Sequence, residues 1–332
     1  MAEYKGIKGF KVQSLGSDPS PVTEGQVWYD TSANALKFSG LAGAWASGGN
    51  LPVARRNEAG VGTQTAALAV MGTPPGSYPA VTTNSEEYDG SAWTAGGSTN
   101  TSRTNMGPCH IGTQTAGQVQ GGYTPGPTGN AHTEQYNGTA WTEVNNLNTG
   151  RWSGTGAGIQ TAGLYTGGTA SGPANTGATE TFNGTSWTEG NDLNQARRYL
   201  AGGGTTTAAI AYAGGPPPSG YANTETYNGT SWTEVNDLNT ARFYAAGIVG
   251  SAAQTNALLC GGQSPPVVGL VEEWDGTSWS EQADLGTART QQAGCSAAST
   301  TAGIISGGSP PYTAATEEWT KSVATKTVTV SG

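Results

Sequence analysis

Arginine, glutamate and tryptophan recur at fixed spacings along this 332-residue chain, and they are the first residues that could do chemistry. Repeated arginines could bind an anion, and repeated tryptophans could stack on sugar rings. Each of the arginines stands ten residues after one of the tryptophans. The arginines are Arg55, Arg103, Arg151, Arg197, Arg242 and Arg289, and the tryptophans are Trp45, Trp93, Trp141, Trp187, Trp232 and Trp279.

The regular spacing favours a structural role for these residues. Six glutamates accompany them, and the first five stand seven residues before a tryptophan. The glutamates are Glu86, Glu134, Glu180, Glu225, Glu272 and Glu317. Equal numbers at a fixed separation predict that each arginine pairs with a repeat glutamate, and that the tryptophans pack between repeats. A period of about 45–50 residues indicates a repeat architecture.

Other reactive residue types are scarce. The two histidines, His110 and His132, fall in different parts of one repeat, which disfavours a copper centre built from paired histidines and tyrosines. Asn or Asp directly precedes glycine here, whereas one residue separates Asp from Gly in the Asp box of sialidases. No zinc-type spacing, phosphate-binding loop or nucleophile elbow occurs. We therefore expect no catalytic residue, no cofactor, no metal site, and a chain that is not an enzyme.

Charge is sparse and unevenly placed. Charged residues make up 11% of the chain, and the formal net charge is -9. All the lysines lie near the ends, at Lys5, Lys8, Lys11, Lys37, Lys321 and Lys326. Because nucleic acids are held mainly by cations on phosphate, this distribution argues against a nucleic-acid partner. The chain has no run of 18 apolar residues and no signal-peptide pattern, so we expect no membrane insertion and synthesis in a cytoplasm.

One repeat, residues 242–279, reads as four short strands joined by turns. The segments RFYAAGIVG, ALLCGG, LVEEW and TSWSE are here called strands A to D. Asp-Gly or Asn-Gly between strands C and D predicts a type I′ hairpin with positive φ at both residues. Strand B ends at two glycines, which let it pass close to neighbouring backbone. The pairs are Gly121-Gly122, Gly167-Gly168, Gly214-Gly215, Gly261-Gly262 and Gly307-Gly308, and the first repeat keeps only Gly72 after Met71.

Only two connections of the repeat vary in length. The spacing from arginine to the second glycine runs from 17 to 20 residues, and that from glycine to glutamate shrinks from 14 to 9. Variable loops on a fixed frame are typical of a scaffold that displays surface. In a meander the B–C loops share a face with the D–A connections, so the Pro-rich B–C loops are the candidate binding rim. The alternative is that these loops only cap the ring. Its candidate contact residues are Tyr78, Tyr123, Tyr221 and Tyr312.

The order of arginine, double glycine, glutamate two residues before an aromatic, and tryptophan resembles the kelch repeat. Residues 45–320 carry all of these features in register. The resemblance implies an all-β chain folded as a β-propeller of four-stranded antiparallel blades. It further implies that strand A lines the central channel and that strand D is outermost.

The number of arginines and glutamates predicts six blades. The sixth repeat contains Arg289, Glu317 and Trp319 but lacks the last strand, and a strand around Trp45 would supply it and close the ring. A seventh blade, built from GQVWYD, NALKFSG, GAWASG and KTVTVSG, is the weaker alternative. Those segments lack the arginine and the double glycine.

The segment EGQVWYDTSANALKFSGLAGAW reads as a small β-meander. It resembles a short module near the N-termini of many tailed-phage structural proteins. We expect an N-terminal arm for virion attachment at residues 1–42, the propeller at 43–322, and a C-terminal strand or tail at 323–332. Together, the arm and the glycine-rich array resemble a virion protein of a bacteriophage.

The resemblances imply a non-enzymatic structural protein of a tailed phage, made in the host cytoplasm and located in the virion. The arm would dock on other virion proteins. The propeller would face outward, as a fibre, tail tip or decoration, and recognise a host-surface glycan or protein receptor. The alternatives are a cellular kelch-type protein-interaction module and, less favoured, a glycan-processing enzyme. Self-association of the chain stays open.

Overall fold

The computed structural model describes residues 12–76, 81–107, 111–125, 129–170, 172, 174–250, 254–295 and 300–328. Every regular element in these ranges is a β-strand, so the expected all-β class is confirmed. None of the described residues belongs to a helix long and apolar enough to cross a membrane. The chain divides into two compact units, Trp45–Thr320 and Met1–Ala44 with Lys321–Gly332. The divisions expected from the sequence lie after residues 42 and 322.

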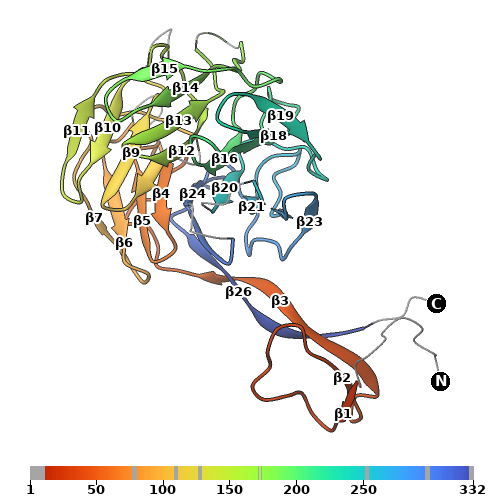
Figure 1. The fold of residues 1–332 in the computed structure, drawn as a ribbon. Coiled ribbons are helices and arrows are strands. Elements are labelled where there is room, and N and C mark those ends of the chain that lie inside the picture. Colours follow the sequence, from red (N-terminus) through yellow and green to blue (C-terminus); the bar gives the residue numbers. More distant parts are fainter. Residues whose placement is uncertain are drawn as a thin grey trace. The chain divides into compact units, whose positions relative to one another are not determined.

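Five antiparallel sheets of four strands fill most of the large unit, each built from consecutive strands (Figure 1). The first is β4 (Ala59–Thr63), β5 (Ala66–Val70), β6 (Ser85–Tyr88) and β7 (Trp93–Ala95), and the second is β8 (Ile111–Thr113), β9 (Ala116–Gln120), β10 (Thr133–Tyr136) and β11 (Trp141–Val144). The third is β12 (Thr155–Ile159), β13 (Ala162–Thr166), β14 (Thr179–Phe182) and β15 (Trp187–Glu189). The fourth is β16 (Ala201–Gly204), β17 (Ala209–Tyr212), β18 (Thr224–Tyr227) and β19 (Trp232–Val235), and the fifth is β20 (Ala246–Val249), β21 (Ala257–Cys260), β22 (Val271–Trp274) and β23 (Trp279–Glu281).

A sixth, mixed sheet has the strand order β1-β2-β3-β26-β25-β24. Its strands are β1 (Gln13–Leu15), β2 (Val27–Asp30), β3 (Ala35–Ser47), β24 (Ala293–Cys295), β25 (Ala302–Ser306) and β26 (Thr316–Thr327). The strand that opens each group packs against its counterpart in the next, through β4, β8, β12, β16, β20 and β24. The large unit is therefore a set of repeated blades with their first strands innermost, a β-propeller-like fold (Figure 1).

The turn between strands C and D differs from the predicted type I′ hairpin. Tyr136 pairs with Trp141, so four residues form the loop instead of two. Asn137 does not have positive φ, whereas Gly138 does (89°). The Asn137 side-chain oxygen accepts hydrogen bonds from the N–H groups of Thr139 and Ala140, at 3.0 and 2.9 Å. The asparagine is thus required for an Asx turn, and only the glycine for its left-handed backbone.

The glycine that ends strand B links one blade to the next. The N–H of Gly122 donates to the carbonyl oxygen of Arg151, and that of Gly168 to Arg197, both at 2.9 Å. Both glycines have positive φ. In the fourth repeat the equivalent donor is Gly214, bonded to the Arg242 carbonyl oxygen at 3.0 Å. In this repeat Ala213 and Gly214 therefore occupy the positions that the glycine pair occupies in other repeats. Ala213 adopts the left-handed conformation found there (φ 58°).

The repeated tryptophans are packed between blades, as expected from their register. Trp141 is buried and lies against Tyr136 in its own blade, with 4.9 Å between ring centroids. Its indole N–H donates to the hydroxyl of Ser85 in the preceding blade at 3.2 Å. The same bond joins Trp93 to Thr316, Trp187 to Thr133, Trp232 to Thr179 and Trp279 to Thr224.

Each register arginine forms a buried ion pair with its repeat glutamate. The nitrogen–oxygen distances are 2.8 Å for Arg103–Glu134, 2.5 Å for Arg151–Glu180, 2.8 Å for Arg197–Glu225 and 3.2 Å for Arg242–Glu272, and Arg55–Glu86 and Arg289–Glu317 also pair. Glu134, Glu180, Glu225 and Glu272 each have a second partner, an asparagine in the preceding D–A connection. Glu225, for example, accepts from the backbone N–H and the side-chain amide of Asn194, at 2.8 and 2.9 Å.

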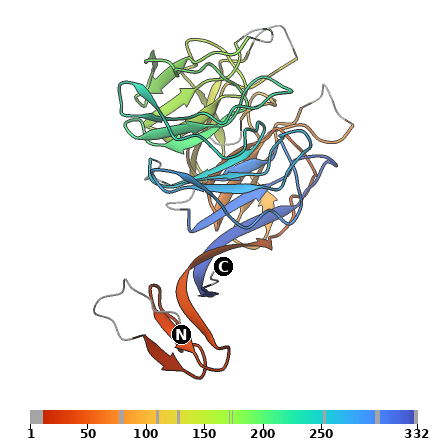
Figure 2. The same cartoon turned by 90° about the vertical axis from the view of Figure 1, so that its right-hand side faces the viewer.

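The small unit contains β1, β2 and the parts of β3 and β26 outside the large unit (Figure 2). Strand β1 pairs parallel to β2, and β2 pairs antiparallel to β3. Lys37 donates to Asp30 at 2.6 Å and to Asp18 at 2.9 Å. Hydrogen bonds from Lys37, Ser32 and Ala33 hold the pKa of Asp30 well below its ordinary value. The weaker seven-blade alternative is wrong, because GQVWYD and NALKFSG lie in this unit.

We predict that Arg197→Ala lowers the free energy of unfolding by about 3–5 kcal/mol, because Glu225 would remain buried without its partner. Both side chains are at most 1% exposed. Urea unfolding measures the loss, and Thr185→Ala, at an exposed turn residue, is the control. Adding Glu225→Gln to Arg197→Ala should recover part of the loss. An Arg197→Ala protein that unfolds like the wild type but no longer binds its target would contradict this role.

Candidate functional site

The starts of the innermost strands and the B–C loops lie at the same end of the blades. The residue after a register arginine forms a β-bridge with the residue that follows the glycine of strand B. These bridges are Arg56 with Thr73, Thr104 with Tyr123, Trp152 with Thr169, Phe243 with Gln263, and Thr290 with Ser309. We call this end of the blades the loop face.

Six residues with positive φ line the centre of the loop face. Each stands two positions after a register arginine, and their φ values lie between 50° and 62°. They are Asn57, Asn105, Ser153, Tyr199, Tyr244 and Gln291, here called the axial ring. Non-glycine residues in this conformation cost about 1–3 kcal/mol each and often occur at functional sites.

Backbone hydrogen bonds hold the axial ring in place. The N–H of Ser153 donates to the carbonyl oxygen of Asn105, and that of Tyr199 to Ser153, both at 2.8 Å. Tyr244 donates to Tyr199 at 3.3 Å, Gln291 to Tyr244 at 2.8 Å, and Asn57 to Gln291 at 2.8 Å. The left-handed backbone is therefore stabilised by bonds between neighbouring blades, whatever side chain a blade carries.

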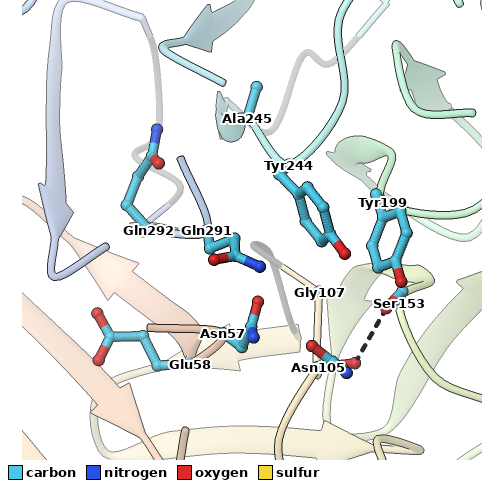
Figure 3. A pocket seen from close by; sticks show the side chains of 10 residues that line it. All are labelled: Asn57, Glu58, Asn105, Gly107, Ser153, Tyr199, Tyr244, Ala245, Gln291 and Gln292. Carbon is cyan, nitrogen blue, oxygen red and sulfur yellow. Dashed lines mark hydrogen bonds between the residues drawn. The ribbon is translucent and has the colours of Figure 1, made fainter. Parts of the chain in front are cut away.

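The side chains of the axial ring surround a small hollow of about 20 Å³, room for about one water molecule (Figure 3). Glu58, Gly107, Ala245 and Gln292 complete its lining. The rings of Tyr199 and Tyr244 lie together on one side, with 3.8 Å between their centroids. Burial raises the pKa of the Tyr244 hydroxyl, and the Tyr199 hydroxyl raises it further. Tyr244 thus stays a neutral hydrogen-bonding group near pH 7.

Glu58 is the one carboxylic acid in this lining. Its carboxylate lies 2.5 Å from Nε of Arg55 and accepts from Ser306 at 3.2 Å, and the residue is 1% exposed. Arg55 therefore faces two carboxylates, Glu58 and Glu86. Burial raises the pKa of Glu58 to about 7, with Arg55 opposing the shift and Glu86 adding to it. Glu58 consequently titrates near neutral pH.

Gln292 also stands out in the lining of the hollow. It is 2% exposed, and its side-chain nitrogen donates to the carbonyl oxygen of Cys260 at 2.8 Å. Its side-chain oxygen has no hydrogen-bond partner among the described residues. An unpaired buried acceptor costs roughly 1–3 kcal/mol, so this oxygen favours a ligand or water that donates to it.

Three of the four predicted rim tyrosines belong to the described residues, and all three are half-buried on the loop face. Tyr123 packs edge-on against Trp152, with 5.6 Å between centroids. Tyr312 lies under the guanidinium of Arg56, which donates to Gln291 at 3.2 Å. Tyr221 is bridged to Arg242 through the backbone. Tyr78 and His110 lie outside the described residues.

The structure separates the repeated residues from the hollow. None of the register arginines, repeat glutamates or repeated tryptophans lines it. The axial ring was missed by the sequence analysis, although a signal exists. Two positions after each register arginine, amide, hydroxyl and aromatic side chains precede segments rich in small residues. No group of three or more His, Cys, Asp or Glu side chains that could hold a metal occurs in the described part of the chain.

No protein-family model and no curated protein matches the sequence. Among solved structures, the chain is similar to the protein described as "Structure of YjhT". The TM-score is 0.66 at 11% sequence identity, and the match covers 83% of this chain and 99% of the other. At this identity the likeness shows a shared fold and no shared activity.

The likeness to YjhT corrects the expectation that the chain is not an enzyme. That prediction is wrong as a deduction from the repeat, because one fold of this kind can carry catalytic as well as binding sites. The sequence lacks the motifs of a few enzyme classes, and that absence says nothing about other classes.

We predict that Glu58→Gln removes a pH dependence of stability between about pH 4.5 and 7. The pKa of Glu58 is about 7 in the folded protein, against an ordinary value of 4.5. In that window the folded state binds more protons than the unfolded state, so the wild type loses stability as pH rises, by up to about 1.4 kcal/mol per pH unit. Urea unfolding from pH 4 to 8 measures the difference between variant and wild type. A difference that is constant with pH would contradict the prediction, and Glu189→Gln, at an exposed position, is the control.

Proposed function

We propose that the large unit is a closed, six-bladed, kelch-like propeller whose sixth blade is β24, β25, β26 and the end of β3. The bonds that join the other blades also support this junction. The N–H of Gly308 donates to the Arg55 carbonyl oxygen at 2.8 Å, and that of Asn57 to Gln291. Strand β24 packs against both β20 and β4. The order of arginine, glycine, glutamate and tryptophan supports the kelch-like assignment.

Trp45 would be the tryptophan of the closing strand. Its ring lies 5.2 Å from that of Trp319, close to the 4.9 Å between Tyr88 and Trp93 in the first blade. The indole N–H of Trp45 donates to the carbonyl oxygen of Ala283 at 3.0 Å. The hydroxyl used elsewhere is missing here, because Val271 occupies the position before the repeat glutamate. The closing strand therefore packs like its counterparts with one hydrogen bond replaced.

A chain that begins at residue 49 should be less stable than one that begins at residue 43, because it lacks Trp45 and leaves β26 with an open edge. We expect a loss of about 3 kcal/mol or more, comparable with the removal of a large aromatic side chain from a core. Thermal unfolding of the two chains, side by side, measures the loss. Equal melting temperatures would exclude β3 as the closing strand.

We propose further that the protein is a structural component of a tailed-phage virion, made in the host cytoplasm, and that its loop face recognises a host-surface glycan or protein. The observation that carries this proposal is the coincidence on one face of the variable B–C loops and the hollow of the axial ring. The buried ion pairs stabilise the blades, so the residues of the B–C loops and of the axial ring can vary without loss of the fold. Recognition therefore falls to residues that differ from blade to blade.

The small unit supports attachment to other virion proteins. It is compact by itself, and its segment EGQVWYD carries the resemblance to phage structural proteins. Exposed apolar side chains are concentrated in it: Val12, Val27, Leu41, Val323 and Val328 are 37–43% exposed. A small sheet with exposed apolar residues favours a partner that covers them. We propose that this unit is the virion anchor of a fibre, tail tip or decoration.

Deletion of residues 1–42 should abolish incorporation into virions of a phage that encodes the chain, while the purified remainder still binds host cells. Mass spectrometry of purified particles measures incorporation, and binding of labelled protein to host cells measures recognition. Incorporation unchanged by the deletion would contradict the anchoring role. Full-length protein that is absent from all particles would instead favour the alternative, a cellular kelch-type interaction module.

A further inference from the structure

We propose that one face of the sheet in the small unit docks an extended segment of another virion protein. The segment would carry apolar side chains that pack on this face, with acidic residues beside them. The inference rests on the attachment role proposed above for the small unit, and it names the surface and the chemistry of the partner. Strands β1, β2 and β3 carry the surface.

The first face of this sheet is covered by the chain itself. Trp28 and Lys37 are cross-strand neighbours and share this face, together with Ser39 two positions further on. The segment before β2 lies over it, because Asp18 binds Lys37 at 2.9 Å and the Thr23 carbonyl oxygen accepts from the Ser39 hydroxyl. Trp28 is accordingly 1% exposed.

The second face is apolar and open to solvent. Ser14, Tyr29 and Leu36 are neighbours across β1, β2 and β3, and Val27 pairs with Phe38 beside them. All five are exposed or half-buried, and Val27 is 43% exposed. The solvated face of a sheet ordinarily carries polar side chains, so an apolar face in this position favours a partner that covers it.

An open hollow of about 440 Å³ lies on the second face. Val12, Tyr29, Leu36 and Val328 are among its lining residues, and all of the lining residues are uncharged. An apolar void of about 150 Å³ holds one benzene-sized group, so a hollow of this volume accepts about two or three apolar side chains. Its size therefore suits a short segment of a partner.

The edge of β1 offers backbone contacts to an extended segment. β1 is the last strand in the order of its sheet, and it pairs only with β2 among the described residues. The N–H and C=O groups of an open edge are a template for another strand. In this mode of binding, backbone bonds supply affinity and side-chain pockets supply selectivity. Because Ser14 of β1 lines the hollow, alternate side chains of an added strand would point into it.

Charge favours an acidic partner. All six lysines of the chain fall in the small unit, and with its four acidic residues they give this unit a net charge of +2. The total of -9 then leaves -11 for the large unit. Lys5, Lys8 and Lys11 directly precede Val12, which lines the hollow. Acidic residues that flank the apolar ones in the partner would complement these lysines and steer its approach.

The test uses the full chain and overlapping synthetic peptides that cover the other proteins of a purified particle. We expect binding to peptides in which alternating apolar residues are flanked by Asp or Glu, and loss of binding when Lys replaces those acidic residues. Val27→Asp and Val27→Lys should each weaken binding of the best peptide at least tenfold. Asp should weaken it more, because only Asp also repels the acidic residues.

Val53→Asp is the matched control, because Val53 is also 43% exposed but belongs to the large unit. It should bind the peptide like the wild type. Val27→Thr, which keeps a β-branched side chain, serves as a further variant if the charged ones do not fold. It should weaken binding about threefold, because a hydroxyl replaces one methyl group at the contact.

Four results would overturn the inference. They are selection of basic peptides, binding that survives every Val27 substitution, no peptide binding by the folded wild type, and a stable wild-type dimer that Val27→Asp dissociates. In the last case a second copy of the chain would occupy the face, which light scattering detects.

Particle incorporation separates this inference from the proposed function. If Val27→Asp enters particles like the wild type while the deletion of residues 1–42 does not, the docking face is wrong and the anchoring role stands. If the peptides bind as expected but the full-length protein is absent from all particles, the docking face stands and the proposed virion function fails.

Discussion

The propeller depends on the buried ion pair between each register arginine and its glutamate. Arg197 shows the arrangement: its guanidinium bonds Glu225 on strand C at 2.8 Å and the Ala211 carbonyl oxygen on strand B at 3.0 Å. Its own carbonyl oxygen accepts from Gly168 of the preceding blade. One residue thus joins three strands of its blade and the neighbouring blade. Because an unpaired buried charge costs several kcal/mol, arginine and glutamate must be retained together, and every blade is held to the same geometry.

The first blade differs from the others at Glu58. This residue contacts both the register arginine of its blade and the hollow of the axial ring. In five repeats the arginine Nε has no hydrogen-bond partner among the described residues. In the first, Glu58 binds Nε of Arg55 and also lines the hollow. The corresponding positions hold Met106, Gly154, Leu200, Ala245 and Gln292. A carboxyl group is acceptable at this depth because Arg55 lies beside it. Burial nevertheless keeps the pKa of Glu58 near neutral, and Glu86, which shares Arg55, adds to the shift.

Most of the blade could be predicted from the sequence, because its features follow from local patterns. The four strands of residues 242–279, the tryptophan packing and the arginine–glutamate pairs all recur at fixed spacing. The predictions that were wrong concern loop length and backbone conformation. Asn-Gly suggested a two-residue hairpin, but the pairing of Tyr136 with Trp141 leaves four residues in the loop. Ala213 takes a left-handed conformation that composition assigns to glycine. The axial ring was missed for a related reason, because long-range backbone bonds, and not residue type, place those six residues at the centre.

Because backbone bonds place the axial-ring residues, each blade can carry a different side chain at this position. Tyr199 and Asn105 have different side chains but similar φ values of 57° and 50°, and each is linked through backbone to the ring residue beside it. The frame has already supplied the stabilisation that holds the strained positions, through the ion pairs and the bonds between blades. The axial side chains can therefore change without disturbing the fold. Divergence among the blades at this position thus favours recognition more than the recurring residues do, because packing constrains the recurring residues and leaves the axial side chains free to differ.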